Sequence, residues 1–308
     1  MLVQFIKSIL VCGAAFGISI QAALFSSAAL LVTNQRSSSV TQFDAAGKPT
    51  LFATAGFEPI TGIALDSGGN VYVADFANGN ILKFSPSGAN LGTFASDAPS
   101  QPLGLVFDSS QNLYAADRGD GTVRKFSPTG VDLGNFATGL SGPQGLAFDQ
   151  NGNLYVSLFS DNTIHKFSPS GADLGIFAST GMNAPSGLKF DGSGNLYVAN
   201  VFGNSIRRFS PTGVDLGNFA TSNLDNPIDL AFGPAGDVFV VNNGRTAIGV
   251  STIRRFSSTG ADLGYFAITG LAVPGFIVFQ TVPEPSTLVL AAVGFVGLAA
   301  WGWRRRKR

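Results

Sequence analysis

Cysteine and histidine are almost absent from the chain, whose 308 residues contain one of each. Cys12 lies in an apolar N-terminal stretch that we expect to be removed, so the mature protein would have neither a disulfide nor thiol chemistry. His165 lies in the segment Thr-Ile-His-Lys-Phe, at a position that we expect to face solvent. General acid–base catalysis by histidine and a Ser-His-Asp triad are therefore disfavoured, and no nucleophile-elbow motif appears.

Charged residues make up only 12% of the chain, with 19 basic and 19 acidic residues. Removing Lys7, the five basic residues at the C-terminus and Glu284, which all lie in terminal segments, leaves 13 basic and 18 acidic residues, a net charge of −5. Such a surface repels polyphosphate, so nucleic acid is not an expected partner. Because 45% of the residues are hydrophobic, we expect a folded body, and residues 40–280 are enough for one core.

The C-terminal end contains an uncharged run over residues 286–303, which are 18 residues long. As a helix this run would measure about 27 Å, close to the roughly 30 Å hydrocarbon core of a bilayer. It is followed by a basic tail that should stay in the cytoplasm, made of Arg304, Arg305, Arg306, Lys307 and Arg308. The sequence therefore predicts a transmembrane helix over 286–303, with everything before Pro283 on the far side of the membrane.

A short motif precedes this helix and consists of Val282, Pro283, Glu284, Pro285 and Ser286. Residues 281–308 as a whole resemble the PEP-CTERM sorting signal of Gram-negative bacteria, in which a Pro-Glu-Pro motif, a short membrane helix and an Arg-rich end are recognised by an exosortase. The resemblance implies a precursor anchored transiently in the inner membrane, processing near the Pro-Glu-Pro motif, and a mature form at the cell surface or outside the cell.

The N-terminal end agrees with export. Lys7 precedes an apolar stretch from Ile9 to Leu31, with small residues near its end that could flank a signal peptidase cut, namely Ala22, Ala23, Ala28 and Ala29. We expect a signal peptide over residues 1–29 and a Ser-rich linker over residues 30–39. A permanent N-terminal anchor is the alternative, because about 20 apolar residues can also span a bilayer.

The middle of the chain is repetitive. An element of the type Phe-x-x-x-Gly-x-x-Leu begins at spacings of 41, 42, 41, 42 and 47 residues, at Phe43, Phe84, Phe126, Phe167, Phe209 and Phe256. A second element, proline followed by glycine and a short hydrophobic strand, begins at Pro59, Pro102, Pro143, Pro185, Pro227 and Pro274. Each unit contains about four short runs rich in Val, Ile, Leu, Phe and Tyr, separated by Gly, Asn, Asp, Ser or Pro turns, which is typical of a four-stranded antiparallel sheet.

Six such units at this period predict an all-β fold, a six-bladed β-propeller over residues 40–280. The last blade should be shared by residues 40–54 and 273–280, which closes the ring. No strand equivalent to 154–157 is evident there, so we expect this blade to have three strands. The 27 phenylalanines should fill the wedges between blades.

The units also resemble NHL repeats, which carry P-x-G-I-A-V-D followed by G-x-V-Y-V-A-D. The segment Pro59 to Asp66 followed by Gly69 to Asp75 matches this pattern, and so does Pro185 to Asp191 followed by Gly194 to Asn200. The resemblance extends over roughly 240 residues and implies a six-bladed propeller with any site at the central funnel, next to the P-x-G glycines.

Those funnel positions hold Thr61, Leu103, Gln144, Ser186, Ile228 with Asp229, and Gly275. A calcium ion needs several converging oxygen ligands, as in lactonases of related propeller shape. Glu58, Gln144 and Asp229 are the candidate ligands, whereas leucine and isoleucine cannot coordinate. The recurring Asp-x-x-Gly-Asn segments resemble calcium loops only in part, because they lack a closing glutamate, and we interpret them as hairpin turns.

Three functions remain open from the sequence. We expect a non-enzymatic binding or scaffold module without a cofactor, whose partners are exopolysaccharide or surface proteins besides the two processing enzymes, exosortase and signal peptidase. The alternative is a metal-dependent lactonase-like or lyase-like enzyme acting outside the cytoplasm, with calcium at the funnel. A sensor domain tethered by both hydrophobic ends is the third possibility.

Overall fold

The computed structural model describes residues 28–56, 59–96, 100–244 and 250–280. They form one compact unit, Ala29–Gln280, in which the described residues are strands joined by turns and loops. Its 24 strands pair into six four-stranded antiparallel sheets, which we call blades I to VI. The predicted all-β class is therefore confirmed.

Blades I to V each use four strands in chain order. Blade I contains β4 (Ile60–Leu65), β5 (Val71–Asp75), β6 (Asn80–Phe84) and β7 (Asn90–Ala95). Blade II contains β8 (Pro102–Phe107), β9 (Leu113–Asp117), β10 (Thr122–Phe126) and β11 (Asp132–Ala137). Blade III contains β12 (Pro143–Phe148), β13 (Leu154–Leu158), β14 (Thr163–Phe167) and β15 (Asp173–Ala178). Blade IV contains β16 (Pro185–Phe190), β17 (Leu196–Asn200), β18 (Ser205–Phe209) and β19 (Asp215–Ala220), and blade V contains β20 (Pro227–Phe232), β21 (Val238–Asn242), β22 (Thr252–Phe256) and β23 (Asp262–Ala267).

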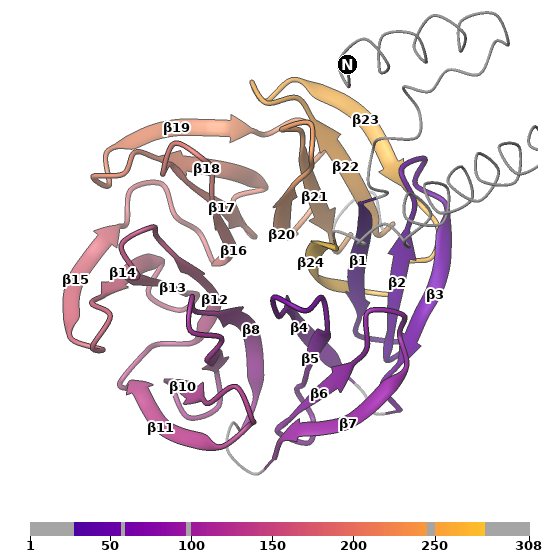
Figure 1. Cartoon of the computed structure of the whole chain (residues 1–308). Coiled ribbons are helices and arrows are strands. Elements are labelled where there is room, and N and C mark those ends of the chain that lie inside the picture. Colours follow the sequence, from indigo (N-terminus) through magenta and orange to yellow (C-terminus); the bar gives the residue numbers. More distant parts are fainter. Residues whose placement is uncertain (1–27, 57–58, 97–99, 245–249, 281–308) are drawn as a thin grey trace, which may run out of the picture. The chain divides into compact units, whose positions relative to one another are not determined.

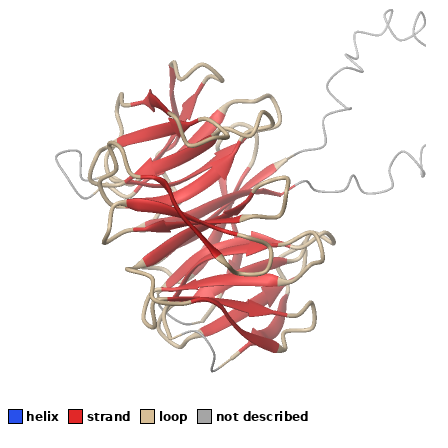
Figure 2. Ribbon diagram, turned by 90° about the vertical axis from the view of Figure 1, so that its left-hand side faces the viewer, coloured by secondary structure: helices blue, strands red, loops and turns tan. Residues whose placement is uncertain are grey.

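The blades surround a common centre (Figure 1). The first strands of successive blades contact one another in the circular order β4, β8, β12, β16, β20 and β24, and β24 contacts β4. The chain thus forms the closed six-bladed propeller predicted from the repeats. Figure 2 shows the ring from the side, with loops and turns on both of its faces.

The two faces differ in the connections they carry. We call the face where each first strand begins and each second strand ends the funnel face. The opposite face carries the turns between first and second strands and between third and fourth strands, and we call it the turn face. In blade I, for example, residues 66–70 lie on the turn face and residues 76–79 on the funnel face.

Blade VI closes the ring with both ends of the unit. Its strand order is β24 (Pro274–Gln280), β1 (Ala29–Asn34), β2 (Ser39–Phe43) and β3 (Pro49–Thr54). Strand β1 pairs with β24 on one side, from Ala29 opposite Gln280, and with β2 on the other. The shared blade was predicted correctly, but the expectation of three strands is wrong because β1 supplies the second strand.

Strand β1 also corrects the domain boundaries. Residues 30–39 are not a Ser-rich linker, because they contain most of β1, a turn over 35–38 and the first residue of β2. The propeller therefore begins at Ala29 rather than at residue 40, and a signal peptide ending at residue 29 would overlap β1. Residues 1–27 and 281–308 lie outside the described residues, so the cut and the transmembrane helix over 286–303 stay predictions.

Aromatic side chains fill the wedges between blades. Tyr72 of β5 lies edge-on between Phe94 of β7 and Phe107 of blade II, with ring centroids 4.8 and 4.9 Å away. The same arrangement recurs around Tyr114, Tyr155, Tyr197 and, with a phenylalanine at the centre, Phe239. Such edge-to-face pairs combine apolar burial with favourable ring electrostatics. These phenylalanines are core residues, as predicted.

The Asp-x-x-Gly-Asn segments form hairpin turns, as interpreted from the sequence. Oδ1 of Asp66 accepts hydrogen bonds from the amides of Gly68 and Asn70, both 2.9 Å long. Its Oδ2 accepts from Nδ2 of Asn70 at 2.7 Å and from the Tyr72 hydroxyl at 3.1 Å. Gly69 has a φ of 78°, which the turn requires and glycine allows at little steric cost. The same four bonds recur around Asp149, and three of them around Asp191. Asp108 also accepts all four, in a turn that has Gln111 in place of the glycine.

Candidate functional site

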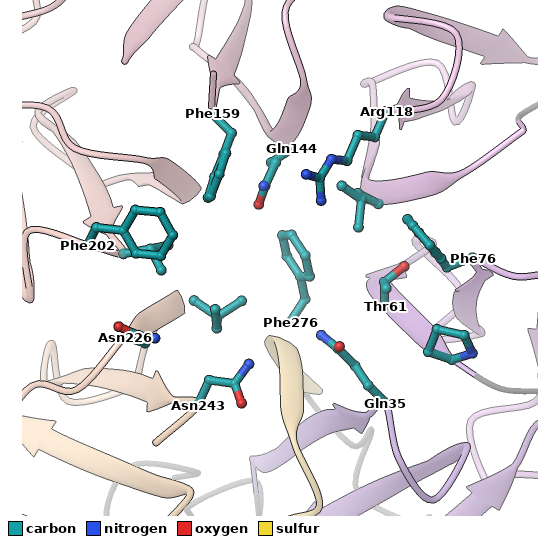
Figure 3. A pocket seen from close by; sticks show the side chains of 14 residues that line it. Gln35, Thr61, Phe76, Arg118, Gln144, Phe159, Phe202, Asn226, Asn243 and Phe276 are labelled. Atoms are coloured by element: carbon teal, nitrogen blue, oxygen red, sulfur yellow. The ribbon is translucent and has the colours of Figure 1, made fainter. Parts of the chain in front are cut away.

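The funnel face carries a pocket at the centre of the ring, with a volume of about 190 Å³ (Figure 3). The described residues that line it come from all six blades: Gln35, Pro59, Thr61, Phe76, Leu103, Arg118, Gln144, Phe159, Val201, Phe202, Asn226, Ile228, Asn243 and Phe276. The pocket is smaller than the roughly 300–1,000 Å³ of sites that enclose drug-sized molecules. It therefore has room for one compact chemical group.

The mouth of the pocket is formed by an outer ring of repeat-equivalent residues. In every blade, the residue directly after the second strand lines the pocket. These six residues are Gln35, Phe76, Arg118, Phe159, Val201 and Asn243. Because the strand before each of them is regular and buried, the six positions are fixed while their side chains differ.

An inner ring lies below, at the starts of the first strands. Thr61, Leu103, Gln144 and Ile228 occupy the position before the P-x-G glycine, and Phe276 occupies the glycine position itself in blade VI. The hydroxyl of Thr61 donates to the carbonyl of Pro102 at 2.8 Å, so it helps to join blades I and II. Phe276 rises in the middle of the pocket in Figure 3.

Glycine at the centre lets the first strands approach closely. A Cβ atom on Gly62 would lie 1.8 Å from the carbonyl oxygen of Leu103, and one on Gly104 would lie 2.2 Å from that of Gln144. Blades V and VI have Asp229 and Phe276 at the equivalent position. Asp229 reaches across to blade IV, where its Oδ1 occupies the space next to Gly187.

Asp229 is fully buried beneath the pocket. Its Oδ2 accepts a hydrogen bond of 3.1 Å from the amide of Ile277, whereas its Oδ1 has no hydrogen-bond partner among the described residues. Burial raises the pKa of this carboxyl, and the positive charge of Lys189 and the backbone hydrogen bonds of Ile277 and Leu230 oppose the rise without cancelling it. Asp229 joins blades IV, V and VI and does not line the pocket.

Arg118 is the only charged residue among the described residues that line the pocket. Its guanidinium carbon lies 5.6 Å from the ring centroid of Phe159, within cation–π range. It forms no ion pair with a carboxylate of the described residues. The described residues of the pocket therefore present one positive charge and no negative charge, although residues 29–280 carry a net charge of −5.

Side chains at the ends of the second strands hold the loops around the pocket. Both carboxylate oxygens of Asp117, next to Arg118, accept backbone hydrogen bonds from the loop before β8, from Ser100 at 2.8 Å and Gln101 at 3.0 Å. Asn34, Asn200 and Asn242 accept equivalent bonds from Ala272, Asn183 and Asp225. The base of the outer ring is thus fixed by buried polar groups.

Amide side chains complete the lining. Gln144 and Asn243 are only 9% and 7% exposed. Oδ1 of Asn243 has no hydrogen-bond partner among the described residues. A buried acceptor without a partner is costly, by about 1–3 kcal/mol.

The three predicted ligands of a calcium ion are not brought together in the described part of the chain. Gln144 lines the pocket, Asp229 is buried below it, and Glu58 lies outside the described residues. The described residues contain no cluster of three or more His, Cys, Asp or Glu that could hold a metal ion. Calcium prefers several carboxylate oxygens, whereas the described lining residues include no carboxylate and one cation, Arg118, so they do not fit a calcium ion.

His165 lies on the third strand of blade III, away from the pocket. Its Nδ1 is 3.5 Å from Oδ2 of Asp173 on the neighbouring outer strand. Arginines at equivalent third-strand positions pair with the corresponding aspartates, as Arg124 does with Asp132. His165 thus occupies the place of an ion-paired surface residue.

Sequence reasoning found the inner ring but missed the outer ring. The signal was present, because every outer-ring residue directly follows a repeated second strand such as Val71–Asp75. Only the glycine-flanking positions were considered, so Arg118 was not recognised as a site residue.

Family models match two parts of the chain. The PEP-CTERM protein-sorting motif matches residues 281–307, and the NHL repeat matches residues 60–84. The chain is an NHL-repeat-like six-bladed β-propeller with a PEP-CTERM sorting signal. The signal indicates export as a membrane-anchored precursor that is processed by an exosortase-type enzyme.

Solved structures share this propeller fold. A chain of a nidogen/laminin complex is 17% identical, with a TM-score of 0.73, over 82% of this chain and 98% of the other. A streptogramin B lyase is 19% identical, with a TM-score of 0.59, over 83% and 81%. A protein of unknown function from Bacteroides caccae is 15% identical, with a TM-score of 0.67, over 83% and 100%. At these identities the likeness extends to the fold alone.

No curated protein matches the chain. Within the described part of the chain, no helix has the length and apolar character needed to cross a membrane.

Proposed function

We propose that this propeller is an exported binding module that acts without catalysis. After processing near Pro283–Pro285, it would present the funnel pocket at the cell surface or outside the cell, to exopolysaccharide or to surface proteins. The main support is the outer ring, where six repeat-equivalent positions carry five different residue types around one cavity. The repeated second strands fix where the six residues lie, and the different side chains give the cavity a specific chemistry.

The lining favours binding over the enzymatic alternative. A lactonase-like or lyase-like site would need carboxylates or a histidine base that converge on the ligand. The described lining residues include neither, and their only charge is the guanidinium of Arg118. Aromatic faces, amides and one cation are suited to holding a ligand in a fixed orientation.

The test is a binding screen with the ring, residues 29–280, which has its own core. The ring would be immobilised and exposed to saccharide and peptide panels, alongside Phe202→Ala in the pocket and Leu174→Ala on an outer strand. Both side chains are more than half exposed, at 57% and 56%. We expect Phe202→Ala to weaken retention and Leu174→Ala to leave it unchanged. Hydrolysis of a lactone panel in the presence of calcium, or retention that is insensitive to Phe202→Ala, would contradict the proposal.

A further inference from the structure

We infer that the funnel pocket binds a sugar ring that carries one carboxylate, a hexuronate, with its carboxylate on Arg118. This inference rests on the proposed function and names the ligand class for the same pocket. It is carried by three features of the lining: one cation without an ion-pair partner among the described residues, several aromatic faces, and amides that can donate and accept hydrogen bonds.

The single cation points to a monoanion. Arg118 reaches from the rim toward the middle of the pocket, where Gln144 also points (Figure 3). A guanidinium matches a carboxylate with two parallel hydrogen bonds, and the apolar surroundings strengthen the pair. A phosphate dianion would call for further cations or a helix N-terminus. The described lining residues provide no second charge, and the described part of the ring has no helix.

The aromatic residues point to a ring with an apolar face. Phe159 and Phe202 lie side by side in the pocket, where their rings meet edge-on at 5.5 Å, and Phe76 lies across the pocket from them (Figure 3). The π-face of a phenylalanine is electronegative and attracts the C–H groups on the flat side of a pyranose. A carboxylate without such a ring, such as acetate, would leave this surface uncovered.

The amides point to hydroxyl groups. Gln35, Asn226 and Asn243 line one side of the pocket, and Gln144 lies between Phe159 and Arg118 (Figure 3). Each amide can both donate and accept. The volume of about 190 Å³ suits one such ring rather than several.

A peptide with a free C-terminal carboxylate is the competing ligand class. Peptides are commonly held through their backbone, by a free strand edge or a nest of amides. The first strands have free edges, but these edges face one another at the centre of the ring. A Cβ atom on Gly62 would already lie 1.8 Å from the carbonyl oxygen of Leu103, so a peptide strand has no room to pair there. The sugar is therefore favoured, and the peptide becomes an outcome of the test.

Calorimetric titration of the ring with methyl glucuronoside and methyl galacturonoside tests the inference, with the methyl ester of each as a neutral match. We expect at least one free acid to bind about tenfold or more tightly than its ester, because the charged hydrogen bonds to Arg118 are lost in the ester. Arg118→Gln should remove this preference and leave binding of the ester nearly unchanged. Arg207→Gln, which removes the same charge from the third strand of blade IV, should leave the preference intact.

Other outcomes separate the inference from the proposed function. If the acid and its ester bind with equal affinity, or if Arg118→Gln weakens the binding of both equally, the hexuronate inference is wrong. The proposed binding function would not be contradicted by either result. Binding of a peptide carboxylate in place of every sugar would lead to the same conclusion. If neither sugars nor peptides bind the ring, the proposed function fails together with the inference.

Discussion

The two faces of the ring are built from the same repeats but use them in opposite ways. On the turn face, Asp66, Asp108 and Asp149 each accept the same four hydrogen bonds from the same positions. On the funnel face, equivalent positions hold residues as different as Phe76, Arg118 and Asn243. Side chains that recur in the blades stabilise the fold, and those that vary line the pocket.

The faces also differ in how polar groups are satisfied. A turn-face carboxylate such as Asp66 is saturated by its own hairpin and approached by Lys83, whose Nζ lies 3.9 Å away. On the funnel face, Arg118 lacks such a partner among the described residues. A ligand can gain free energy only where bonds are still to be made, so the funnel face is the one suited to binding.

The largest effect on stability should come from deleting strand β1, which runs from the turn face to the funnel face. Strand β1 begins on the turn face and ends at Asn34, next to Gln35 of the pocket, and it buries Leu30, Leu31 and Val32 almost completely. Each such side chain contributes about 1.5–3 kcal/mol, and whole domains are stable by only about 5–15 kcal/mol. We expect a chain that starts at residue 35 to lose cooperative urea unfolding, as measured by circular dichroism.

The matched control is a chain that starts at residue 29, which keeps β1 and should unfold cooperatively. If the shorter chain folds as stably as this control, then β1 does not close the ring. The comparison also bears on the signal peptide, since a cut beyond Ala29 would shorten β1.

Strand β1 shows where sequence reasoning reached its limit for the fold. The repeats predicted six blades and the shared last blade, because Pro59 and its equivalents recur at nearly constant spacing. Strand β1 was missed because Leu30 and Leu31 continue the apolar N-terminal run from Ile9, and an apolar run alone does not distinguish an export segment from a buried strand. Only the pairing of Ala29 with Gln280 shows that these residues form a strand of the ring.

The site was predictable in position but not in composition. The NHL-like pattern placed it at the funnel, and Gln144 does line the pocket. Asp229 was considered a ligand because it is a carboxylate at the centre, yet it takes the place of a glycine and is buried between blades. Whether a side chain there points to the axis or to the next blade depends on packing, which the sequence does not show.

The next largest effect concerns the turn face. We expect Asp66→Ala to lower the free energy of unfolding by about 2 kcal/mol, because four hydrogen bonds to a carboxylate are lost together. Urea unfolding of the ring at pH 7 measures this loss. Binding of the uronoside to the variant should equal that of the wild type. A weaker uronoside affinity without loss of stability would contradict the separation of the two faces.

The same residue gives a pH dependence. Partial burial alone would raise the pKa of Asp66, but hydrogen bonds from Asn70, Tyr72 and Gly68 outweigh it and lower the pKa below its usual value. The carboxylate therefore stabilises the folded state above the unfolded-state pKa of about 4, and this contribution is lost as the pH falls through the lowered value. The difference between wild type and Asp66→Ala should shrink in acid.

Asp229, beneath the pocket, should give a smaller pH dependence of stability, opposite in sign to that of Asp66. Because burial raises the pKa of Asp229, the folded protein holds a proton that the unfolded chain releases, and stability falls as the pH rises above about 4. Asp229→Asn keeps an acceptor for the amide of Ile277 and removes the charge. We expect this variant to gain stability relative to wild type as the pH is raised from 5 to 8, because it forms no buried charge.

Asp149→Asn is the control for this measurement, since its carboxyl has a lowered pKa from hydrogen bonds of the turn, which outweigh partial burial. It should lose stability relative to wild type at neutral pH and recover in acid. A change at Asp229 that is independent of pH would mean that its charge state does not differ between the folded and unfolded protein.

The smallest expected effect is that of the sorting signal on binding. Ala29 and Gln280 pair at the turn face, where Nε2 of Gln280 donates to the carbonyls of Gly69 and Pro86. The chain thus enters and leaves the ring on the face opposite the pocket, so processing should leave the funnel unchanged. We expect the full chain in detergent and the ring ending at Gln280 to bind the uronoside with the same affinity in calorimetric titration. Weaker binding by the full chain would show that a terminal segment reaches the funnel, and the two faces would then not act independently.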